Sequence, residues 1–137
     1  MPYWIIALIV FFVLDLIFVI IILVKRARGK VFSLKELQYI KSHWIRIIDT
    51  FSNNPQSAIM DADKLLYYAL DRKGIEGTLG EKLKKAGLRF SDLNGVWKAH
   101  KLRNRVAHEL SAELNVDEAK KALRQFKRAL NDLGANL

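Results

Sequence analysis

The fold is expected to depend on the stretch Trp97-Lys98-Ala99-His100-Lys101-Leu102-Arg103-Asn104-Arg105-Val106-Ala107-His108-Glu109-Leu110. It contains no glycine, no proline and no run of β-branched residues, so it predicts one helix. At about 100° per residue, its apolar side chains share one broad face. They are Val96, Ala99, Leu102, Val106, Ala107, Leu110 and Leu114. The stretch is therefore expected to be an inner helix of an all-α domain.

The same helix carries polar side chains on and beside its apolar face. Arg103 lies inside the face, while His100, Asn104 and His108 follow one another at i, i+4 and i+8 along its edge. A buried guanidinium needs an acceptor or a route to water, so Arg103 either extends its charged end to solvent or faces a polar cleft shared with His108. Arg103 and His108 point in different directions on an ideal helix. A site that uses both would work best where two copies of the helix meet.

The segment Arg103-Asn104-Arg105-Val106-Ala107-His108 resembles the Arg-polar-(x)n-His signature of HEPN domains, with four residues between Arg103 and His108. The resemblance covers about residues 33–134. HEPN domains are small helical bundles that usually dimerise across this motif; many are metal-independent ribonucleases, and others are inactive or serve as binding modules. The resemblance implies catalytic roles for Arg103, Asn104 and His108. His100 is a candidate accessory residue that the signature itself does not require.

The length and composition of the chain limit which other classes of function are possible. The 137 residues allow one domain and an appendage, and the net charge of +9 suits anionic lipid headgroups, nucleic acid or both. The absence of cysteine excludes a disulfide framework, a thiolate nucleophile and a cysteine-based zinc site. Gly74, Gly77 and Gly80 follow a predicted helix and do not fit a P-loop. No cofactor and no metal are expected.

Residues 1–24 predict a transmembrane anchor. Tyr3 to Val24 is almost continuously apolar and reaches the length of about 20 residues that a membrane-spanning helix needs. A cleavable signal peptide is disfavoured, because no basic side chain precedes Lys25 and no Ala-x-Ala stretch is present. Asp15 lies near the middle of the span and either contacts another membrane helix or is tolerated by a very apolar one.

Residues 25–32 form a basic linker next to the anchor. By the positive-inside rule, its cationic residues place the C-terminal domain in the cytoplasm, next to the inner or plasma membrane. The same residues should attract anionic lipid headgroups. The flanking cations are Lys25, Arg26, Arg28 and Lys30. We therefore expect a single-pass membrane protein with membrane lipids among its partners.

Residues 33–137 predict an antiparallel bundle of four to five helices. Their starts are marked by capping residues: Ser33 with Glu36, Asn54 before Pro55, Thr78 with Glu81, Ser91 or Asp92, and Asn115 with Glu118. No strand-like alternation and no repeat appear. Asp61 and Asp63 are two positions apart and point to different sides, so they are interpreted as early-helix acids and not as a catalytic pair.

Two functional hypotheses follow from these patterns. In the first, the protein is a dimeric, metal-independent endoribonuclease in which His108 transfers protons, Arg103 binds the phosphate and Asn104 orients His108 or the substrate. In the second, it is a non-catalytic, membrane-tethered homodimer that binds nucleotide, RNA or a protein partner. A purely structural membrane protein is a third, weaker alternative. The sequence leaves the choice open.

Overall fold

The computed structural model describes residues 1–109 and 113–137, with the side chains of these residues other than 27 and 28. The described residues form six α-helices and one short 3₁₀ helix, η1, and contain no β-strand. The elements are α1 (Tyr3–Arg28), α2 (Leu34–Phe51), α3 (Pro55–Arg72), α4 (Leu79–Lys85), η1 (Gly87–Arg89), α5 (Leu93–His108) and α6 (Val116–Asp132). The all-α class is confirmed, and the count of elements after the first helix is slightly above the four to five expected.

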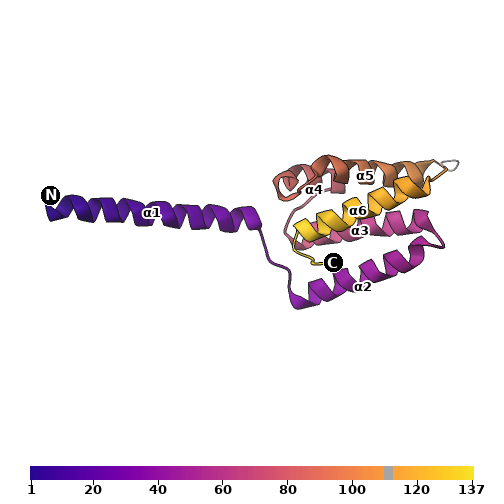
Figure 1. Cartoon of the computed structure of the whole chain (residues 1–137), viewed down its shortest axis with the longest axis horizontal. Coiled ribbons are helices and arrows are strands. Elements are labelled where there is room, and N and C mark those ends of the chain that lie inside the picture. Colours follow the sequence, from indigo (N-terminus) through magenta and orange to yellow (C-terminus); the bar gives the residue numbers. More distant parts are fainter. Residues whose placement is uncertain (110–112) are drawn as a thin grey trace.

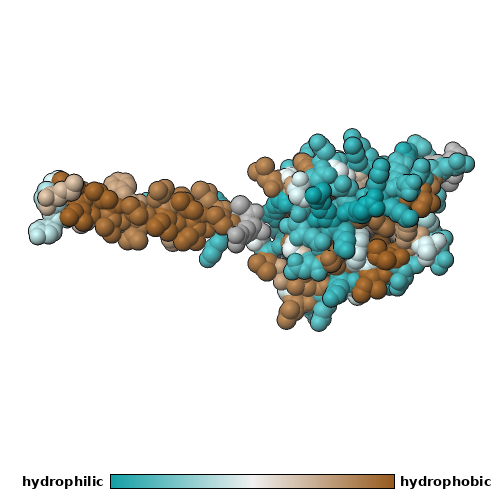
Figure 2. Space-filling view, in the orientation of Figure 1, coloured by the Kyte–Doolittle hydropathy of each residue, from teal (hydrophilic) through white to brown (hydrophobic). Residues whose placement is uncertain are grey.

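Helix α1 stands apart from the rest of the chain. It has 26 residues, which at a rise of 1.5 Å per residue gives a length of about 39 Å. Its large apolar side chains are exposed and belong to no core, and Figures 1 and 2 show it projecting from the helical domain with an apolar surface along its length. The helix is long and apolar enough to cross a membrane. The side chain of Arg28, at its end, lies outside the described part.

The remaining helices pack around one hydrophobic core, in which α3 lies against α2, α5 and α6 (Figure 1). The burial of apolar stripes drives this arrangement, because each helix carries apolar residues at helical spacing. The largest fully buried apolar side chains are Ile40, Ile59, Leu66, Leu70, Leu83, Val96, Phe126 and Leu130. As a result, the inner face of α3 is held against the inner face of α5, where the candidate motif lies.

The expected caps set most of the helix starts. Ser33 and Glu36 form a reciprocal capping box at α2, and Thr78 and Glu81 form another at α4. At α3, Asn54 accepts from the backbone of Ser57 and Pro55 occupies the first turn; at α5, Asp92 accepts from Gly95. Asn115 caps α6 through the backbone N–H of Asp117, whereas its expected partner Glu118 forms an ion pair with Arg105.

Helix α5 is shorter than the sequence predicts. It ends at His108, and Glu109 leaves the helical conformation with φ −104° and ψ 103°. The predicted apolar face is buried at Val96, Ala99 and Leu102 and partly buried at Val106 and Leu114. Ala107 is exposed, contrary to prediction, because the last turn extends past the core. Leu110 lies outside the described residues.

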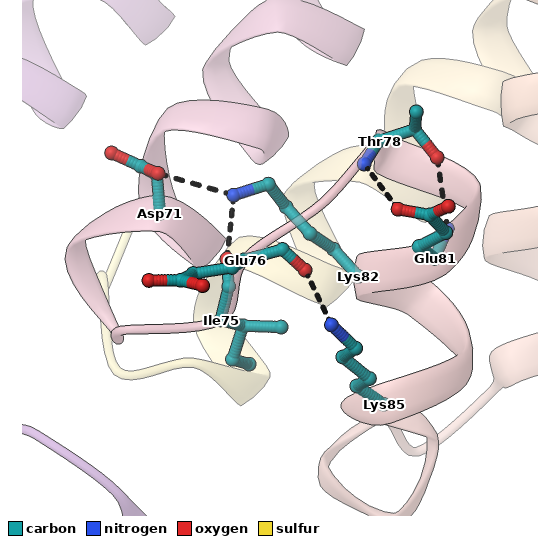
Figure 3. A network of polar contacts seen from close by, with 7 residues as sticks. All are labelled: Asp71, Ile75, Glu76, Thr78, Glu81, Lys82 and Lys85. Carbon is teal, nitrogen blue, oxygen red and sulfur yellow. Dashed lines mark hydrogen bonds and ion pairs between the residues drawn. The ribbon is translucent and has the colours of Figure 1, made fainter.

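The turn between α3 and α4 is held by a buried lysine (Figure 3). The Lys82 ammonium donates to the Asp71 carboxylate at 3.1 Å and to the backbone carbonyl of Ile75, although the side chain of Lys82 is only 1% exposed. Lys85 donates to the carbonyl of Glu76 at 2.9 Å. These bonds satisfy buried polar groups that would otherwise be costly. The turn that contains Gly74 and Gly77 is therefore fixed to α4.

Candidate functional site

The polar side chains of α5 meet a buried carboxylate from α3. Asp63 is 5% exposed, and its Oδ1 accepts a hydrogen bond from Nδ1 of His100 at 2.8 Å. The His100 side chain is itself only 14% exposed. Asp63 is placed inward because it shares the inner stripe of α3 with Ile59 and Leu66, at spacings of four and three residues. A carboxylate in this position needs partners, and α5 supplies them.

Arg103 and Asn104 complete a closed polar ring with these two residues. Nη1 of Arg103 donates to Oδ1 of Asn104 at 3.0 Å, and Nε of Arg103 lies 3.4 Å from Oδ2 of Asp63. The amide nitrogen of Asn104 lies 3.4 Å from Nε2 of His100. We call Asp63, His100, Arg103 and Asn104 the polar ring. On α5, Arg103 and Asn104 lie three and four positions after His100, so all three residues share one side of the helix.

The contacts of the polar ring admit one consistent assignment of protons. A carboxylate accepts only, so Nδ1 of His100 carries the proton that is donated to Asp63. Nε2 of His100 is then the acceptor for the Asn104 amide, whose oxygen accepts from Arg103. Nε of Arg103 is buried and makes a charge contact with Asp63 without the geometry of a hydrogen bond. Each of the four residues thus contacts two others of the ring.

This arrangement limits the chemistry of the polar ring within one chain. A histidine oriented by a carboxylate is a common general base, and an arginine beside it can bind an anion. Here, however, Nε2 of His100 faces the Asn104 amide, and the charge of Arg103 is balanced by Asp63. The main effect of the ring is therefore to hold α5 against α3. Arg103 lies at the edge of the ring and is 26% exposed.

The structure brings together three of the four residues expected at the site. Arg103, Asn104 and His100 are joined in the polar ring, whereas His108 is exposed at the last position of α5. Within the described residues, no hydrogen bond joins His108 to Arg103 or Asn104. Arg103 is half-buried beside Asp63, and a polar cleft shared with His108, the second interpretation of Arg103, stays a prediction.

Sequence reasoning missed Asp63, which was interpreted as an early-helix acid. The residue lies beyond the first turn of α3, where the helix dipole no longer explains a carboxylate. The exposed neighbour Asp61 has the same residue type and differs only in facing solvent. A signal was present: an acid on the inner stripe of one helix and an arginine on the inner stripe of another predict a buried pair.

A groove lies between α5 and α6, on the other side of α5. Its volume is about 550 Å³, and its floor contains Ala99, Leu102 and Ala122. Cationic side chains of both helices line it, together with two acids and two amides. The cations are Lys98, Lys101, Arg105 and Lys121, the acids Asp92 and Glu118, and the amides Asn94 and Gln125. Figure 2 shows the hydrophilic surface that covers this side of the domain.

The acids of the groove have local partners. Glu118 accepts from Arg105 at 2.9 Å. The backbone N–H of Gly95, together with the amide of Gln125 and the nearby cations, holds the pKa of Asp92 below its ordinary value. The four cations of the groove outnumber its two acids, so the groove carries a net positive charge. Among the described residues, no group of three His, Asp or Glu side chains is placed to hold a metal ion.

Comparison of the chain with models of protein families, with curated proteins and with solved structures finds no match.

Proposed function

We propose that α1 anchors the protein in a membrane, with the helical domain on the cytoplasmic side, and that this domain binds RNA without cleaving it. The anchoring proposal is supported by the length and apolar surface of α1 and by Lys25 and Arg26 at its end. The domain has a core of its own, which begins at Phe32 and includes no residue of α1. The RNA-binding proposal is supported by the groove between α5 and α6.

The observation that carries RNA binding is the set of cations along this groove. Lysines from two helices line a channel whose floor is apolar, so phosphates can contact the rims while a base or ribose lies on the floor. The exposed face of α6 continues the positive surface beyond the groove with Lys120, Arg124, Lys127 and Arg128. An extended polyanion suits such a surface better than a single small anion, because it engages many cations at once.

The polar ring favours binding over cleavage. Metal-free cleavage of RNA requires a base near the 2′-hydroxyl and a cation near the phosphate, both free to act. Within one chain, Arg103 is paired with Asp63 and His108 lies apart from it. The polar ring is thus better suited to fixing the register of α5, on whose far side the cations of the groove are displayed.

Fluorescence anisotropy with a labelled single-stranded RNA tests the proposal on the full-length protein in nanodiscs. Replacing Lys101 with Gln removes one phosphate contact, so the affinity should fall and the slope of log K against log salt should flatten by about 0.7. The control is Lys41→Gln, an equal charge change on the exposed side of α2. Equal losses for both variants, or no binding by the wild-type protein, would contradict RNA binding in the groove.

An endoribonuclease is the second candidate, favoured by the exposure of His108 at the end of α5. In a homodimer formed across this helix, His108 of one copy would approach Arg103 of the other. The test is incubation of the full-length protein with RNA, followed by gel analysis, and sedimentation to measure its oligomeric state. Cleavage that is lost in His108→Ala and kept in His43→Ala would establish this candidate. RNA that remains intact with the wild-type protein supports binding without cleavage.

A further inference from the structure

Two cationic side chains meet where the anchor joins the helical domain. The guanidinium of Arg89 packs over Gly29, at the position where a Cβ would come within 2.8 Å of both of its terminal nitrogens. The ammonium of Lys73 lies 4.2 Å from the centre of the Phe32 ring. Gly29 and Phe32 both belong to the linker that follows α1. The ends of α3 and η1 are thereby brought to the linker.

This junction holds positive charge with little compensation. Nη1 of Arg89 is buried and has no hydrogen-bond partner among the residues that the structure describes. Burial, and then the charge of Arg89, lowers the pKa of Lys73, whereas Glu36 acts in the opposite direction. The Glu36 carboxylate already accepts from the backbone of Ser33 in the cap of α2. A buried guanidinium nitrogen without an acceptor is costly, and an anion would satisfy it.

Exposed apolar side chains lie next in sequence to residues of this junction. Val31 is 83% exposed, Leu34 is 81% exposed and Leu88 is fully exposed. Leu88 precedes Arg89 on η1, and Val31 and Leu34 flank Phe32 in the chain. Cations interspersed with exposed aliphatic side chains are typical of surfaces that enter the headgroup layer of a bilayer.

The length of the linker determines what can cover this surface. Only five residues, 29–33, separate α1 from α2, so they span at most about 17 Å. Figure 1 shows α4 and the start of α2 at the end of the domain that faces α1, and the turn between α2 and α3 at the opposite end. With α1 in a membrane, the end of the domain that carries Lys73 and Arg89 lies at the level of the lipid headgroups.

We propose that this end of the helical domain docks on an anionic bilayer, where Arg89 and Lys73 bind the phosphate of a lipid headgroup and Leu88, Val31 and Leu34 enter the interface. The inference rests on the proposed anchoring by α1 and is independent of RNA binding. It gives the domain a fixed face toward the membrane. The groove between α5 and α6 then stays accessible from the cytoplasm.

Depth-dependent fluorescence quenching tests the docking. The chain has no cysteine, so single substitutions can each carry one environment-sensitive dye in the full-length protein. The protein is placed in nanodiscs that contain nitroxide-labelled lipid, made from phosphatidylcholine with or without phosphatidylglycerol. Leu88→Cys reports docking, Asn53→Cys at the α2–α3 turn reports the far end, and Leu14→Cys reports insertion of α1.

Docking predicts that the dye at 88 is quenched in anionic nanodiscs and less in phosphatidylcholine alone, and that the dye at 53 is not quenched in either. Lys73→Gln should reduce the ratio of docked to free domain roughly fivefold, because a cation near an anionic surface contributes that much. Lys41→Gln, the same change on the exposed side of α2, should leave the quenching at 88 unchanged.

The outcomes separate this inference from the anchoring. If the dye at position 14 is quenched and the dyes at positions 88 and 53 are quenched equally and weakly, docking is refuted and the anchoring by α1 is retained. If the quenching of the dye at position 88 depends neither on lipid charge nor on Lys73→Gln, the proposed phosphate site is refuted. A dye at 14 that escapes quenching would refute the anchoring itself, and docking with it.

Discussion

The imidazole of His100 lies 2.8 Å from the carboxylate of Asp63 and joins α5 to α3 across 37 positions of the chain. Both side chains are mostly buried, so the contact is poorly screened by water. Arg103 adds its charge on the same side of the carboxylate. The stability of the domain should therefore depend on Asp63 more than on any exposed acid.

Replacing Asp63 with Ala leaves the half-buried guanidinium of Arg103 without its counter-charge and the imidazole N–H of His100 without its acceptor. We expect a loss of roughly 3 kcal/mol in the free energy of unfolding and a midpoint lower by more than about 10 °C. Circular dichroism during heating measures it. Asp61→Ala, two positions away and exposed, is the control and should change the free energy by less than about 0.5 kcal/mol. Equal effects would contradict the role of Asp63.

The two arginines of the motif should differ in their contribution to stability. Arg103→Gln removes the charge next to buried Asp63 and should cost about 2 kcal/mol. Arg105→Gln removes an ion pair between side chains that are 42% (Arg105) and 45% (Glu118) exposed. The loss in the free energy of unfolding should therefore stay below about 1 kcal/mol. Urea denaturation of the two variants gives the comparison. A larger loss for Arg105→Gln would show that the polar ring is not a stabilising contact.

Lys82 is a second buried ionic group that can be tested. Lys82→Met keeps most of the volume but leaves the carbonyl of Ile75 without its donor and removes the cation 4.3 Å from the centre of the Tyr67 ring. The expected loss is about 1–3 kcal/mol in urea denaturation. The matched variant Lys84→Met changes an exposed lysine on the same helix and should be nearly neutral. If Lys82→Met has the same free energy of unfolding as the wild-type protein, Lys82 does not stabilise the turn between α3 and α4.

The cap of α5 predicts a pH dependence of stability. The backbone N–H of Gly95 is the main cause that holds the folded-state pKa of Asp92 below its ordinary value of 3.8. The stabilising effect of Asp92 is therefore complete above pH 3.8 and is lost as the pH falls through the lower folded value. Asn is also a good cap but does not titrate, so Asp92→Asn should flatten this part of a plot of unfolding free energy against pH. An unaltered slope would exclude Asp92 as its source.

Local signals in the sequence were enough to predict the fold class and most of the helix starts. The caps at Ser33, Asn54 and Thr78 act within three residues of themselves, so their bonds are visible in the sequence. The apolar length of α1 is likewise a local property. The end of α5 was less predictable, because Glu109, the first residue after it, is a good helix former and only the lack of core beyond His108 marks the end.

The candidate site was predicted in part, because its partners are distant in sequence. The spacing of His100, Arg103 and Asn104 places them on one side of α5, and the structure confirms that they lie together. Asp63 comes from another helix, and only tertiary packing decides which side chain of α3 meets them. The separation of His108 from Arg103 within the chain likewise follows from where α5 ends. The catalytic and dimeric roles inferred from the motif stay predictions.

The five residues between α1 and α2 also determine how copies of the protein would meet one another. With α1 embedded, each domain is confined to a layer next to the bilayer, so encounters occur in two dimensions. The effective concentration of neighbours then depends on the number of copies per unit area of membrane, as for any short tether. An interface too weak to hold a pair together in dilute solution can suffice there. Self-association would therefore follow crowding of the membrane and not the amount of protein per volume of cell.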